Sequence, residues 1–126
     1  MTTLKERATV ELGRIFELAT DGVENVTMPS RYIDSVWHDM LKEPASYEAF
    51  CKRVAGVVVE HTPAQGEGEI TWVSSYEEKF GKLDSVWFTD EHGVLDNNLY
   101  ETYLETGHVR ASWDCTPGIT PVENEG

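Results

Sequence analysis

Apolar residues recur every three or four positions along much of the chain, which is the spacing that places them on one face of an α-helix. In the first third of the chain, this pattern predicts a helix over 3–20 that ends at an Asp-Gly turn. A second helix should begin at Pro29 and Ser30, because proline fits a first helical turn and serine can accept a bond from an unpaired backbone N–H. Pro44 should end it.

A third apolar stripe predicts a helix that Ser46 caps, that runs to His61 and that Pro63 closes. The connection to the preceding helix is short, so the two helices should form an antiparallel hairpin with its bend at Pro44. The valines at 57–59 would also suit a strand, but the stripe continues through them and favours a helix.

The second half of the chain predicts shorter elements. Residues 64–69 should form a glycine-containing link, followed by helices over 69–80 and 96–106. Residues 82–90 should be extended, and 108–115 should form a strand or a packed tail.

The predicted fold is therefore mainly α, a compact bundle of about five helices around the helical hairpin. A short two-stranded β element could form from the regions of Val86 and Val109, towards the C-terminus. Residues 1–126 should make one domain, since 126 residues is an ordinary domain size, with a frayed tail from about 118.

The charge narrows the possible partners. Twenty-three acidic residues against ten basic ones give a net charge of −13, which disfavours nucleic acid and anionic membrane surfaces. We therefore expect the partner to be a small molecule or a protein, and a basic protein would suit the charge. No signal segment and no apolar run of about 18 residues is present, so we expect a cytoplasmic protein whose two cysteines are free thiols.

The hairpin suggests a site for chemistry. Folding at Pro44 would bring His38 to the level of Cys51, and Asp34, one helical turn before His38, could orient the imidazole. Cys51 could then act as a nucleophile with His38 as its base. A thiol on an apolar stripe is more often a small core residue, and that interpretation stays open.

A metal site is the alternative use of the same residues. His38 and Cys51, with Asp114 and Cys115 from the C-terminal region, could hold zinc or iron. On an unbroken helix, His61 would lie about 15 Å from Cys51, so one ion could not bind both. Either the helix ends before His61, or Cys51 and His61 serve separate purposes.

The aromatic residues also allow two interpretations. They could belong to the core or line a pocket for an aromatic or apolar ligand. The pocket candidates are Trp37, Tyr47, Trp72 and Trp113.

One pattern resembles a known family. It consists of Trp37-His38, Tyr47, Phe50-Cys51, Gly56, His61 and Pro63. With this pattern, about a quarter of the chain resembles the glycine-rich domain-containing protein-like family, and the later segments 72–80, 83–90 and 112–117 look like those of small actinobacterial relatives. The resemblance implies a helical protein and assigns no reaction.

Three functional hypotheses follow from the sequence. The first is a ligand-binding or accessory domain with a pocket around His38, Cys51 and the tryptophans. The second is a small enzyme, metal-assisted or thiol-based, that uses His38 with Cys51 or Cys115. The third is an acidic protein that engages a basic partner. The sequence leaves open whether the protein is an enzyme and whether it is a monomer.

Overall fold

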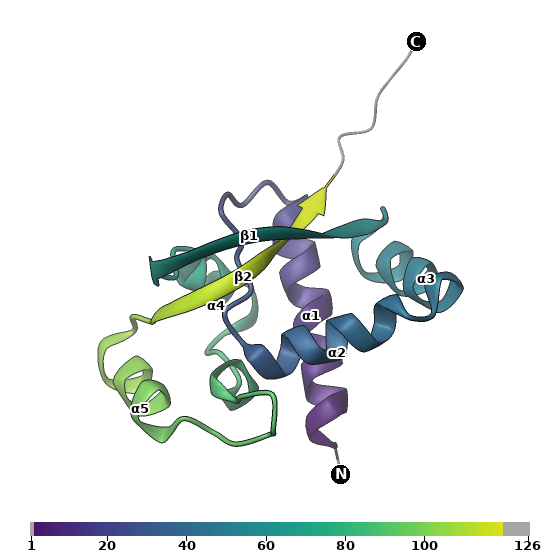
Figure 1. Ribbon diagram of the computed structural model, residues 1–126. Helices are drawn as coiled ribbons and strands as arrows, with labels where there is room; N and C mark the ends of the chain where they lie inside the picture. Colours follow the sequence, from purple (N-terminus) through teal and green to yellow (C-terminus); the bar gives the residue numbers. More distant parts are fainter. Residues whose placement is uncertain (1, 120–126) are drawn as a thin grey trace.

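The fold combines helices with one two-stranded sheet, in a computed structural model that describes residues 2–119 (Figure 1). Within these residues the helices are α1 (Leu4–Thr20), α2 (Arg31–Leu41), α3 (Pro44–Ala55), α4 (Val73–Phe80), α5 (Asn97–Thr106) and the 3-10 helix η1 (Ser85–Phe88). The strands are β1 (Val59–Glu69) and β2 (Arg110–Ile119). The prediction of a mainly α protein with a short β element is thus confirmed.

The two strands form a long antiparallel ribbon that passes over α1, with α3 on one side of that helix and α4 and α5 on the other (Figure 1). The pairing runs from Val59 opposite Ile119 to Glu69 opposite Arg110, with one irregularity between Pro63 and Gly66. Because side chains alternate between the two faces of a strand, this register decides which of them meet the helices.

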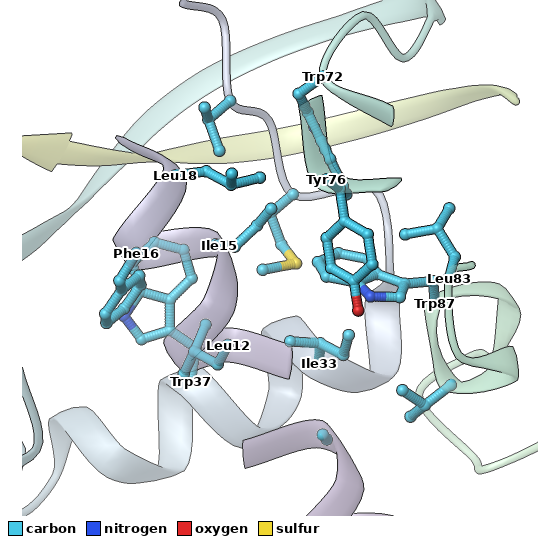
Figure 2. Packing of buried hydrophobic residues seen from close by; sticks show 14 of the residues in the cluster. Leu12, Ile15, Phe16, Leu18, Ile33, Trp37, Trp72, Tyr76, Leu83 and Trp87 are labelled. Carbon is cyan, nitrogen blue, oxygen red and sulfur yellow. The ribbon is translucent and has the colours of Figure 1, made fainter. Parts of the chain in front are cut away.

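Helix α1 is the centre of the core. Its residues Leu12, Ile15 and Phe16 are fully buried, and Figure 2 shows an aromatic group on each side of Ile15. On one side, Phe16 packs edge-on against Trp37, with ring centroids 5.2 Å apart. On the other side lie Trp72, Tyr76 and Trp87. The core thereby fixes α2 relative to α1, which matters for the site described below.

A buried carboxylate ties this core together. Glu11, only 3% exposed, accepts hydrogen bonds from Trp87 Nε1 at 2.9 Å and from the Tyr76 hydroxyl. It also pairs with Arg14 at 3.1 Å. A buried charge is tolerated when it is paired and hydrogen-bonded in this way, so Glu11 links α1 to α4 and η1.

The predicted third helix was wrong in its second half. It ends at Ala55 instead of His61, because Gly56 adopts a left-handed conformation with φ 80° that ends the helix, as C-terminal glycines commonly do. Residues 59–69 then form β1, so the predicted link over 64–69 is a strand, and Pro63 lies inside it. Helix α3 begins with Pro44 in its first turn, so Ser46 is not its cap.

Three further expectations need correction. Helix α4 begins at Val73, four residues later than predicted. The Val86 region forms η1, and the partner of β2 is β1. Gly118 and Ile119 belong to β2 instead of a frayed tail; residues 120–126 lie outside the described residues.

None of the described helices has the length and apolar character needed to cross a membrane.

Candidate functional site

Asp34 and His38 are placed by the start of α2. The Ser30 side chain caps this helix by accepting a bond from Ile33 N–H at 3.1 Å, and it is anchored because its hydroxyl donates to Val86 O at 3.1 Å. Asp34 and His38 therefore lie one turn apart on the same helical face, with His38 Nε2 3.5 Å from Asp34 Oδ2. The predicted neighbourhood of these two residues is confirmed.

His61 reaches the same carboxylate from β1. Its Nε2 lies 3.2 Å from Asp34 Oδ1, and its ring centroid is 4.4 Å from that of His38. The Trp37 ring packs edge-on against His61 at 4.5 Å and covers one side of it. A strand in place of a helix after Gly56 is what makes this approach possible.

Three potential metal ligands therefore converge. One ligand atom each from Asp34, His38 and His61 lies within 4.8 Å of the others. Bonds of about 2.0–2.1 Å to a tetrahedral ion place neighbouring ligand atoms roughly 3.3 Å apart. Each oxygen of the Asp34 carboxylate makes one contact close to that separation: Oδ1 lies 3.2 Å from His61 Nε2, and Oδ2 lies 3.5 Å from His38 Nε2.

The site is partly open to solvent. The His38 side chain is 56% exposed, whereas those of Asp34 and His61 are 23% and 18% exposed. An ion bound between them would thus be held by two mostly buried side chains, those of Asp34 and His61, and would be approached from the side of His38.

A fourth residue touches the carboxylate from β2. The sulfur of Cys115, which is 1% exposed, lies 3.1 Å from Asp34 Oδ1. Burial raises the pKa of the Cys115 thiol far above its ordinary value, and the nearby Asp34 carboxylate raises it further. Since the thiolate is the reactive form, Cys115 is a hydrogen-bond donor here and not an activated nucleophile.

A buried hydrogen-bond chain holds β1 next to α2. Trp37 Nε1–H donates to the Tyr47 hydroxyl at 3.0 Å, and that hydroxyl donates to Val59 O at 2.5 Å. Burial raises the pKa of Tyr47, so its hydroxyl stays protonated and remains a donor. Val59 precedes His61 by two residues, and the chain therefore helps to set the position of the imidazole.

The other predicted metal ligands lie elsewhere. Cys51 is buried on α3 beside the Tyr47 hydroxyl, and the cluster of metal-capable side chains found among residues 2–119 does not include it. Asp114 is half-exposed and pairs with Arg31 at 3.3 Å. Of the predicted set, His38 is in the cluster and Cys115 contacts it.

The predicted pocket residues have mainly packing roles in the structure. Trp37 and Trp72 are buried, and Trp72 Nε1 donates to Thr27 O at 3.0 Å. Trp113 lies against Gly66 across the ribbon. A hollow of about 440 Å³ between α1 and α3 and another of about 460 Å³ beside α5 are lined by neither His38 nor Cys51. A ligand pocket around these residues stays a prediction.

Comparison with protein-family models matches the first part of the chain to a family. The model of the UCP032817-like family matches residues 4–71, just over half of the 126 residues. The matched segment contains Asp34, His38 and His61, whereas Cys115 lies beyond it. No curated protein and no solved structure matches the chain.

Proposed function

The chain belongs to the UCP032817-like family, and we propose that it binds a divalent transition-metal ion through Asp34, His38 and His61. The observation that carries this proposal is the convergence of two imidazole nitrogens and one carboxylate within 4.8 Å. Only two of the three residues share a helix, so local sequence spacing alone does not account for the cluster.

The donor set favours particular metals. Two histidines and one carboxylate bind zinc in several catalytic centres and ferrous iron in oxygenases, and in both classes the protein leaves coordination positions free. Zinc is the first probe because the donor separations suit a tetrahedral ion. The net charge of −13 also favours the approach of a cation.

Three features of the cluster and its neighbour Trp37 would assist binding. Asp34 lies between the two imidazoles, Trp37 shields one side of His61 from water, and the exposed His38 leaves a path for a further ligand. A metal in such a centre supplies an acidic bound water or a polarised substrate oxygen. This extends the second sequence hypothesis, a metal-assisted enzyme.

The thiol-based form of that hypothesis has less support. Both cysteines are buried, and the raised pKa of Cys115 keeps its thiol protonated. The idea of a basic protein partner remains a separate proposal that rests on the charge alone.

Isothermal titration calorimetry, in which zinc is added to chelator-treated protein, tests the proposal. We expect one zinc ion per chain, and we expect His38→Ala and His61→Ala each to weaken binding by more than about 10-fold, since even outer partners of a metal site contribute that much. His92→Ala and His108→Ala serve as controls, because these histidines lie outside the cluster. Equal zinc affinity in all five proteins would contradict the proposal.

A further inference from the structure

We propose that Cys115 sets the metal preference of this centre by holding one oxygen of Asp34 away from the ion. The inference rests on the metal site proposed above and concerns a positioning residue. Cys115 does not belong to the group of ligand atoms within 4.8 Å of one another, but its sulfur contacts a member of that group.

The contact has the geometry of a hydrogen bond that the thiol donates, with 3.1 Å between the Cys115 sulfur and Asp34 Oδ1. Asp34 Oδ1 therefore has a donor on β2, in addition to its 3.2 Å contact with His61 Nε2 on β1. Its partner oxygen, Oδ2, is the one that faces His38, at 3.5 Å.

Cys115 is also held firmly in place. Its backbone O accepts a hydrogen bond from Met28 N–H at 3.1 Å, and its residue pairs with Pro63 in the ribbon. With 1% of its surface exposed, the side chain has little room to leave the carboxylate. The S–H donor is therefore a fixed feature of the site and does not depend on a mobile surface group.

A carboxylate with one oxygen engaged binds an ion through the other oxygen alone. Single-oxygen binding suits a tetrahedral ion such as zinc or cobalt(II). Larger oxygen-seeking ions such as calcium and manganese take six or more ligands and gain from two-oxygen binding by a carboxylate. Cys115 should thus favour zinc over manganese through Asp34.

Competition between zinc and manganese tests this role. Cys115→Ala removes the thiol donor from Oδ1 and makes this oxygen more available to the ion. The ratio of zinc affinity to manganese affinity should therefore fall by about 10-fold, within the usual effect of a group that orients a ligand. Cys115→Ser keeps a donor and should restore most of the ratio. Cys51→Ala, which removes a buried thiol outside the cluster, should leave the ratio unchanged.

Cobalt(II) spectra of the unaltered protein give a second measurement that does not depend on how well a variant folds. We expect the strong visible absorption of four-coordinate cobalt without a near-ultraviolet sulfur-to-cobalt band. That sulfur band would make Cys115 a ligand and overturn the positioning role. An unchanged metal ratio in folded Cys115→Ala would also overturn it while leaving the metal site intact, whereas failure of the unaltered protein to bind zinc or cobalt would refute the proposed function itself.

Discussion

Asp34 and Cys115 are 81 positions apart in the chain, yet the Cys115 sulfur lies 3.1 Å from Asp34 Oδ1. The same oxygen is 3.2 Å from His61 Nε2 on the other strand of the ribbon. One carboxylate on α2 therefore contacts both β1 and β2. A change in the position of either strand should alter the geometry of the candidate metal centre.

Tyr47→Phe should destabilise the protein. The substitution removes the hydroxyl that links Trp37 Nε1–H to Val59 O and leaves both buried groups without that partner, which costs about 1–3 kcal/mol in the free energy of unfolding. Urea unfolding measures the loss. The matched control is Tyr32→Phe, because the Tyr32 hydroxyl has no hydrogen bond with another described residue; equal stability of both variants would contradict the role given to Tyr47.

Gly66→Ala should weaken the ribbon. Gly66 has no left-handed backbone, so the cost is steric: a Cβ atom there would lie 2.6 Å from the Trp113 ring. We expect a loss of about 1–3 kcal/mol in the free energy of unfolding. In a Trp113→Ala background the same substitution should cost much less, since the clash is gone; a cost that is equal in both backgrounds would show that the ring is not responsible.

Asp84 should contribute stability that is lost in acid. Burial alone would raise the pKa of Asp84, but hydrogen bonds from the Arg7 guanidinium and the Val86 N–H outweigh it and hold the pKa below its ordinary value. A carboxyl with a lowered pKa in the folded state stabilises the protein above the unfolded-state pKa and loses that effect as the pH falls below about 4.

Asp84→Asn should therefore lower the free energy of unfolding at pH 7 by about 0.5–1 kcal/mol, since the ion pair with Arg7 is partly exposed. Thermal or urea unfolding across pH 2–7 measures the difference, which should shrink towards the acid end. A difference that stays constant down to pH 2 would exclude the ionised carboxylate as its source.

Both cysteines should be unreactive in the folded protein. Cys51 and Cys115 are buried, and the raised pKa of Cys115 removes the thiolate that alkylating reagents attack. At pH 8 we expect slow labelling of the native chain and rapid labelling of two thiols in denaturant, counted by mass spectrometry. Fast labelling of Cys115 without denaturant would show that the thiol does not stay on Asp34.

The helical class could be predicted because α1, α2 and α5 are amphipathic, and each begins at a residue whose side chain caps it. Thr3, Ser30 and Asp96 accept hydrogen bonds from backbone N–H groups of the first turn. The contact of Asp34 with His38 was also predictable, since it depends only on the spacing of one helical turn.

The position of His61 could not be deduced from periodicity. The apolar stripe of α3 continues in sequence into three valines, although the helix stops at Gly56. The signal was present as a glycine followed by β-branched residues, which favours a helix end and then a strand. Cys115 depends on the register of two strands distant in sequence, and no local pattern determines such pairing.

The most direct test of the metal centre observes the histidine ring nitrogens by NMR during zinc addition. We expect the Nε2 resonances of His38 and His61 to shift together, saturating at one zinc per chain, while those of His92 and His108 stay unchanged. Zinc-dependent shifts at His92 or His108 instead, or no shift at any histidine, would contradict a metal centre at Asp34, His38 and His61.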